Sequence, residues 1–225
     1  SRDGRSLATA SASDREIQLR DTLSGDVRST VPLSDGRWQR FRLSPDGRRL
    51  ATAQSVPGSK YLSLQLWSVP DGLPLSSPMP VPDSESGSSA AVFFSDDDRF
   101  LIFWGRKHLE VRDGSTGLSL APPAPYEPAG TVHRWSFTRD GTRMLLRGAN
   151  VTVWDLATGQ IAGKTPDLEG GVEKLSIADD DQTMLTTSPD GYARVWDVET
   201  QQLLGEPVLQ QRAAPVGSLS PDGRT

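Results

Sequence analysis

Ser44-Pro45-Asp46-Gly47-Arg48 is a short phrase that occurs, with variations, six times in the 225 residues of the chain. Pro presets the backbone φ, Asp can accept hydrogen bonds from nearby backbone, and Gly takes a positive φ, so the phrase is typical of a tight turn. Related phrases occupy residues 1–5, 95–99, 138–142, 178–182 and 220–224. With the third residue of each as anchor (3, 46, 97, 140, 180 and 222), the spacings are 43, 51, 43, 40 and 42 residues.

A second phrase ends 15 to 22 residues after each of the first five anchors. Its five versions are Leu19-Arg20-Asp21, Leu66-Trp67-Ser68, Val111-Arg112-Asp113, Val153-Trp154-Asp155 and Val195-Trp196-Asp197. Short alternating apolar stretches flank the turns, which predicts antiparallel strands joined as hairpins. We expect further turns at Asp14, at Asp190-Gly191 and at Thr158-Gly159, with an outer strand at 160–164 after the last. Each period of about 43 residues therefore predicts four short strands.

The two phrases and their period resemble WD40 repeats over essentially the whole chain. The resemblance implies an all-β protein, a β-propeller of four-stranded antiparallel blades, with about five blades present. It also implies structural repeat positions at Trp67, Trp154, Asp155, Trp196, Asp197, Asp14 and Asp190. The three Trp side chains are expected to pack between blades.

The chain departs from the WD40 pattern at several positions. The Gly-His pair common in the family is missing from every repeat, Arg20 and Arg112 replace Trp, and Ser68 replaces Asp. The buried His–Asp–Trp hydrogen-bond network associated with the family therefore cannot form in the usual way. We expect apolar packing between blades to contribute more of the stability.

We interpret residues 1–225 as one propeller domain with repeat units at 1–43, 44–94, 95–137, 138–177 and 178–219. The first unit lacks its inner strand, and residues 214–219 are an inner strand without a blade. These two ends could pair and close a five-bladed ring. WD40 propellers are mostly seven-bladed, which needs about 290–300 residues at this period, so we expect a fragment of a larger ring.

Composition argues against several classes of function. The net charge is −5 and the pI is about 5.1, which does not favour nucleic-acid binding. No apolar window approaches the length of a membrane span and no signal segment opens the chain, so we expect no membrane insertion and a cytoplasmic location. The absence of Cys excludes disulfides and thiolate sites.

The sequence offers no recognisable catalytic constellation. The two histidines, His108 and His133, fall in different repeats, and no nucleophile elbow is present. The acidic triplets at 96–98 and 179–181 stand where other repeats carry Pro-Asp-Gly, so we interpret them as turn residues. We therefore predict no enzyme activity, no metal and no cofactor.

A candidate binding set lies at the expected inner strands. Arg40, Arg134 and Lys174 hold equivalent positions in three repeats and would form a basic arc near the channel, together with Trp38 and His133. We hypothesise that the arc binds an acidic or phosphorylated protein segment. The alternative is local pairing with Asp or Glu on adjacent loops. Trp135 aligns with apolar inner-strand positions, and we expect it in the core.

The function predicted from these observations is a non-catalytic scaffold for protein–protein interaction, with signalling as its expected context. One alternative is an accessory sensor or docking domain of a multidomain enzyme, such as a bacterial Ser/Thr kinase. Another is a TolB-like periplasmic propeller, which uses similar turns. The stretch at 153–159 favours the WD40 kind.

Overall fold

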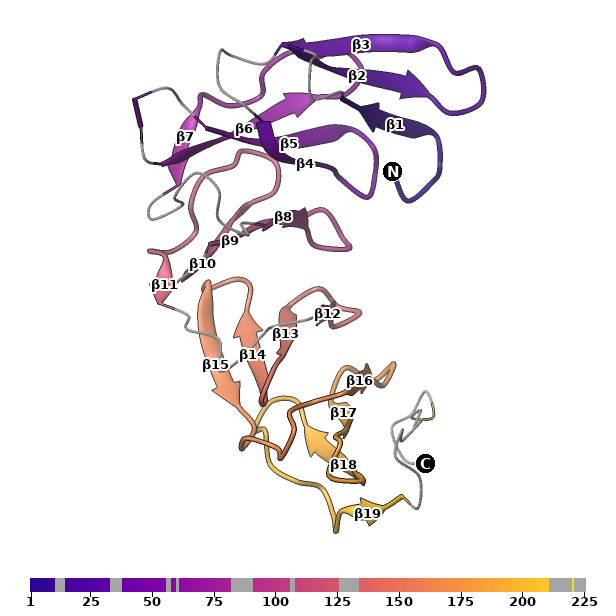
Figure 1. Ribbon diagram of the computed structural model, residues 1–225, viewed down its shortest axis with the longest axis vertical. Helices are drawn as coiled ribbons and strands as arrows, with labels where there is room; N and C mark the ends of the chain where they lie inside the picture. Colours follow the sequence, from indigo (N-terminus) through magenta and orange to yellow (C-terminus); the bar gives the residue numbers. More distant parts are fainter. Residues whose placement is uncertain are drawn as a thin grey trace. The chain divides into compact units, whose positions relative to one another are not determined.

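The computed structural model describes the chain except at residues 11–14, 33–37, 56–57, 60, 82–90, 106–107, 126–133, 211–219 and 221–225, and except for the side chains of residues 38 and 39. The described residues form 19 strands in five separate antiparallel sheets (Figure 1). No helix occurs among the described residues, so they contain no helix that is long and apolar enough to cross a membrane. The chain divides into two compact units, Ser1–Glu127 and Pro128–Thr225.

The first unit holds three sheets, and within each one the strands are ordered as they follow along the chain. The first has three strands: β1 (Ser6–Thr9), β2 (Glu16–Asp21) and β3 (Val27–Pro32). The second has four: β4 (Trp38–Leu43), β5 (Arg49–Ser55), β6 (Leu62–Ser68) and β7 (Met79–Val81). The third has four: β8 (Ala91–Phe94), β9 (Phe100–Trp104), β10 (His108–Asp113) and β11 (Ala124–Pro125).

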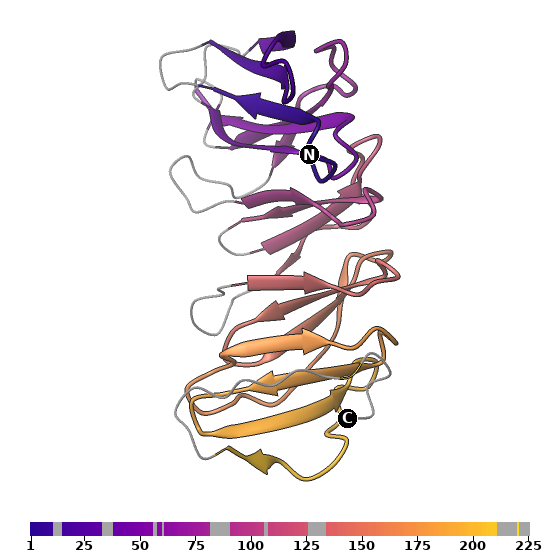
Figure 2. The ribbon, with the colours of Figure 1, turned by 90° about the vertical axis from the view of Figure 1, so that its right-hand side faces the viewer.

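The second unit holds two four-stranded sheets of the same kind (Figure 2). One contains β12 (Arg134–Phe137), β13 (Arg143–Arg147), β14 (Val151–Asp155) and β15 (Gln160–Lys164). The other contains β16 (Lys174–Ile177), β17 (Thr183–Thr187), β18 (Tyr192–Asp197) and β19 (Val208–Leu209). The expected strand at 160–164 is therefore present, and the all-β prediction of four-stranded antiparallel sheets is confirmed for four of the five sheets.

In the four four-stranded sheets the recurring turn phrase joins the first two strands, as predicted, whereas residues 1–5 precede β1. In the Ser44 turn, the N–H of Gly47 donates to the carbonyl of Ser44 at 2.9 Å, and Gly47 has a φ of +68°. Asp98 and Asp181 hold the glycine position in the two acidic turns, with φ values of 65° and 57°. This backbone conformation strains a side chain, and Asp tolerates it better than most residues.

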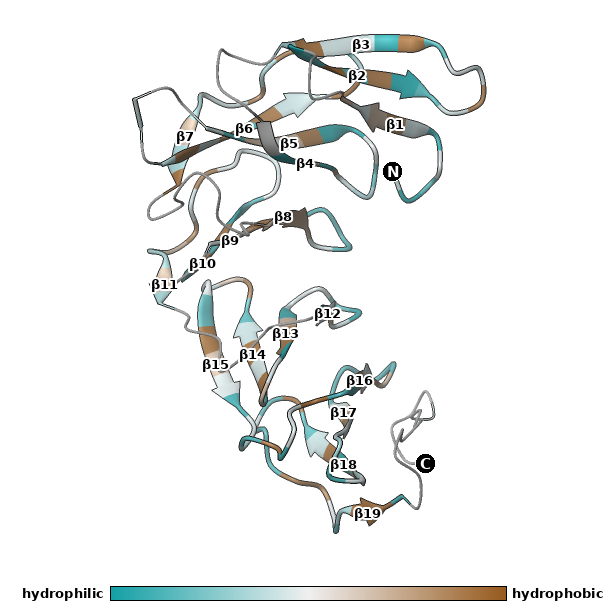
Figure 3. Ribbon diagram, viewed as in Figure 1, coloured by the Kyte–Doolittle hydropathy of each residue, from teal (hydrophilic) through white to brown (hydrophobic). Residues whose placement is uncertain are grey.

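Buried apolar side chains fill the space between neighbouring sheets of one unit. Figure 3 marks the hydrophobic positions along the strands in brown. Trp67, Trp154 and Trp196 are all at least 94% buried, which confirms their predicted burial. Two of them are also held by a hydrogen bond: the indole N–H of Trp67 donates to Thr52 Oγ1 at 2.9 Å, and that of Trp196 to Thr186 Oγ1 at 2.8 Å. The acceptor stands on the adjacent strand in both sheets.

In two sheets of the first unit an arginine stands at the tryptophan position, and the two arginines make the same kinds of hydrogen bond. Arg112 donates to the carbonyl of Gly117, five residues later, and Arg20 donates to the carbonyl of Gly25 in the same way. Each guanidinium also bonds the side chain two residues earlier on its own strand, Glu110 for Arg112 and Gln18 for Arg20.

The expectation that Trp135 lies in the core is wrong, since the side chain is 39% exposed. Leu145 pairs with Ser136 and belongs to the apolar cluster between the two sheets of the second unit. Successive residues of a strand point to opposite faces, so Trp135 lies on the face of its sheet that β16–β19 does not cover.

Candidate functional site

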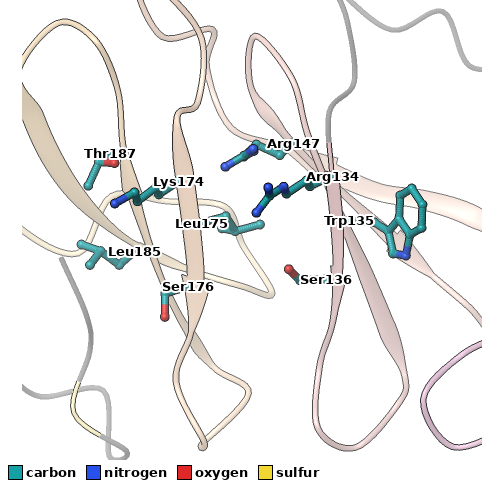
Figure 4. Close-up of a pocket in the computed structure, with 9 residues that line it drawn as sticks. All are labelled: Arg134, Trp135, Ser136, Arg147, Lys174, Leu175, Ser176, Leu185 and Thr187. Carbon is teal, nitrogen blue, oxygen red and sulfur yellow. The ribbon is translucent and has the colours of Figure 1, made fainter. Parts of the chain in front are cut away.

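A pocket of about 430 Å³ lies between the two sheets of the second unit (Figure 4). Its lining residues come from the start of β12 and β16 and from β13 and β17. They are Arg134, Trp135, Ser136, Arg147, Lys174, Leu175, Ser176, Leu185 and Thr187. No Asp or Glu is among them, and the three cations make this pocket basic. We call it the basic pocket.

Strand register brings two arginines together in the basic pocket. Arg134, the first residue of β12, pairs directly with Arg147, the last residue of β13. Directly opposed residues extend to the same face of an antiparallel sheet, with Cβ atoms about 5 Å apart. Figure 4 shows both side chains extending from their strands toward β16. Ser136 follows two residues later and therefore shares this face.

Lys174 also lines the basic pocket, but its side chain extends away from the two arginines (Figure 4). Leu175, its neighbour in β16, packs against the cluster between the sheets, so alternation places Lys174 on the far face of β16. Thr187 is the register partner of Lys174 and shares that far face. The basic pocket therefore has an arginine pair on one side of β16 and a lysine on the other.

The electrostatics of the arginine pair are unfavourable in the free protein. Burial lowers the pKa of Arg147, and the charge of Arg134 lowers it further, against a smaller opposing effect of Glu173. Arg147 donates to the backbone carbonyl of Glu173, while its Nε is buried and has no hydrogen-bond partner among the described residues. Among the described residues, no carboxylate forms an ion pair with either arginine. The pair is thus suited to an anion from outside.

The remaining predicted binding residues are Arg40, Trp38 and His133. Arg40 pairs with Ala53 in the first unit. Trp38 has its backbone in β4, but its side chain lies outside the described part, as does all of His133. The sequence-based prediction does not include Arg147. Pairing the last residue of the second strand of each sheet with the first residue of the first strand would have identified it.

The predicted structural Asp positions close turns by accepting hydrogen bonds. Asp155 and Asp197 each accept from the backbone N–H three residues later, at 2.8 Å from Thr158 and 2.7 Å from Thr200. Asp190 forms an ion pair with Arg194 at 2.7 Å. Asp14 lies outside the described residues.

A second pocket, of about 460 Å³, lies at the turns of the second unit and is rich in carboxylates. These carboxylates already have partners: Asp181 accepts from the backbone N–H of Asp140 at 2.8 Å, and Glu199 bonds Arg143 at 2.8 Å. Within the described part of the chain, no group of three or more His, Asp or Glu side chains could hold a metal ion. We therefore assign these acids to the structure of the turns.

The basic pocket thus combines two guanidinium groups with a nearby hydroxyl, an arrangement that can hold an anion by charge-assisted hydrogen bonds. The sequence matches no protein-family model, and a search of curated proteins finds no significant match.

Proposed function

We propose that this protein is a non-catalytic interaction module of the WD40 propeller kind, and that its basic pocket binds an acidic segment of a partner protein. The observation that carries the proposal is the pairing of Arg134 with Arg147 in a pocket whose described lining residues include no carboxylate. The successive antiparallel sheets and the buried Trp positions support the propeller part of the proposal.

The arginine pair is an arrangement that folding alone does not favour. Like charges directly opposite each other destabilise an antiparallel pair, and partial burial of Arg147 adds a desolvation cost. Residue pairs that destabilise the fold in this way are expected at functional sites. A bound carboxylate would offset the repulsion by accepting paired hydrogen bonds from a guanidinium, which matches its geometry.

A chemically neutral screen tests this proposal. The chain would be immobilised and used to select binders from a phage-displayed library of random peptides. We expect the selected peptides to be enriched in Asp and Glu. Because the contact is electrostatic, we expect their affinity to fall by about tenfold or more in an Arg134→Glu variant.

Arg139→Glu is the matched control, since it makes the same charge change at an exposed turn of the same unit. It should leave peptide affinity within about twofold of the parent, because exposed charges away from the contact contribute little. Selection without acidic enrichment, or equal losses in the two variants, would remove the support for the proposal.

A further inference from the structure

We infer that the anion bound by Arg134 and Arg147 is the phosphate of a phosphorylated serine or threonine in the partner segment. This inference rests on the proposed function and specifies the ligand of the same pocket. Three features of the pocket favour a phosphate: the charge of the arginine pair, the hydrogen-bond donors on the same face, and the size of the pocket.

Charge balance favours a phosphate over a carboxylate. The two opposed guanidiniums carry two positive charges, and neither has an ion pair among the described residues. A carboxylate would neutralise one of these charges, whereas a phosphate monoester carries about −1.5 to −2 near neutral pH. A phosphate therefore relieves the repulsion between both arginines at once.

The donors on this face suit an acceptor with several oxygens. The guanidinium of Arg134 makes no hydrogen bond with any other described residue, so its N–H groups are free to donate. Ser136 lies on the same face, two residues along β12, and its hydroxyl likewise has no hydrogen bond within the described part. A phosphate monoester offers three strong acceptor oxygens, against two in a carboxylate.

The pocket is larger than a phosphate group requires. Its volume of about 430 Å³ falls in the range of sites that enclose whole ligands. Leu175 supplies an apolar surface opposite the arginines, where it packs against the cluster between the sheets. The space and this surface fit a phosphorylated side chain attached to a peptide, with the phosphate at the arginines.

Three degenerate peptide libraries test the inference, identical except for a central residue fixed as phosphoserine, glutamate or serine. Binding of each labelled library to the chain would be measured by fluorescence anisotropy at physiological salt. We expect the phosphoserine library to bind at least about tenfold tighter than the glutamate library, because it adds charge and an acceptor oxygen. We expect Arg134→Gln and Arg147→Gln each to remove most of this preference.

Two further variants test the assignment to the arginine pair and its neighbouring hydroxyl. Ser136→Ala should weaken phosphoserine binding by about threefold or more through loss of one donor. Arg139→Gln is the matched control at an exposed turn of the same unit, outside the pocket, and should change the preference by less than about twofold. An equal loss with Arg139→Gln would overturn the assignment to the arginine pair. Thermal unfolding of each variant verifies that it is folded.

The outcomes distinguish this inference from the proposed function. Equal binding of the phosphoserine and glutamate libraries would overturn the phosphate inference and leave the acidic-segment function standing. Absence of binding by both would overturn the two together. If inorganic phosphate alone bound as tightly as the phosphoserine library, the ligand would be a small phosphate compound, and the phosphorylated partner would be excluded.

Discussion

Arg112 and Glu110 form an ion pair with an N–O distance of 2.9 Å, and both side chains are more than nine-tenths buried. Arg112 stands at the position that Trp67 occupies in the preceding sheet of the same unit. The guanidinium thus fills a space that an aromatic ring fills in other repeats, and its charge is compensated by a carboxylate on its own strand. The pair is a structural substitute for a core tryptophan.

Replacement of Glu110 by Gln should lower the free energy of unfolding by about 3–5 kcal/mol, because it leaves the charge of Arg112 buried without a compensating carboxylate. Replacement of both residues, as Arg112→Met with Glu110→Leu, should be neutral or stabilising, since no charge is then buried. Urea denaturation of the chain measures both changes. Asp179→Asn, in the exposed pair with Arg139, should cost less than about 1 kcal/mol. A similarly small loss in Glu110→Gln would contradict the burial argument.

Asp181 should stabilise the second unit despite its positive φ. Its carboxylate accepts from the backbone N–H groups of Arg139 and Asp140, in the turn of the neighbouring sheet. Asp181→Gly relieves about 1 kcal/mol of backbone strain but removes two charge-assisted hydrogen bonds of about 1.5–3 kcal/mol each. We expect a net loss of about 2–5 kcal/mol in chemical denaturation, with a smaller loss for Asp181→Asn. A gain in stability for Asp181→Gly would show that strain outweighs the contact.

The acid sensitivity of the fold should depend on Asp190. Hydrogen bonds from Arg194, Ser188 and the backbone of Tyr192 outweigh burial and lower the pKa of Asp190 from 3.8 to about 2. A lowered pKa in the folded state means that the unfolded chain binds more protons between these values. The resulting stability is complete above about pH 4 and is lost as the pH falls toward 2.

Asp190→Asn should therefore reduce stability by about 1–2 kcal/mol at pH 7 and by clearly less at pH 3. Denaturant midpoints measured across this range test the prediction. Asp113, whose pKa is also lowered to about 2, chiefly by the Ser115 hydroxyl, should behave in the same way when changed to Asn. A loss of stability that stays constant from pH 7 to pH 3 would contradict the link between the lowered pKa and the stability of the fold.

Removal of Arg134 should stabilise the free protein. Arg134→Gln ends the repulsion with Arg147 across the strands and should raise the free energy of unfolding by about 0.2–1 kcal/mol. The gain should shrink at high salt, because ions screen exposed charges. Arg139→Gln, at an exposed turn, is the control and should show no such gain. Loss of stability in Arg134→Gln would mean that the arginine pair is compensated within the protein.

Much of the sheet architecture could be predicted from local chemistry. The Ser-Pro-Asp-Gly turn forces a hairpin because Gly47 takes a positive φ, and the structure places a hairpin there. The acidic triplets form the equivalent turns with Asp98 and Asp181 in the glycine position. The carboxylate of Asp98 also accepts from the backbone N–H of Asp46 in the neighbouring sheet, at 3.1 Å, a contact that no local pattern indicates.

The candidate site was only partly predictable. Equivalent positions predict Arg134 and Lys174, but in the structure Arg134 extends from β12 toward one face of β16, and Lys174 extends from the opposite face of β16. Arg147 was missed, because its partnership with Arg134 depends on the register between β12 and β13. Trp135 was misplaced, because its burial depends on which face of its sheet is covered.

The sequence by itself determined the all-β character, the repeat and the turns, because each follows from the backbone preferences of a few adjacent residues. Tertiary structure alone decided that Arg134 meets Arg147, that Glu110 compensates Arg112, and that Trp135 is exposed. The physical reason is that charge and burial depend on neighbours across strands and between sheets. Such neighbours are distant in sequence, and only register and packing bring them together.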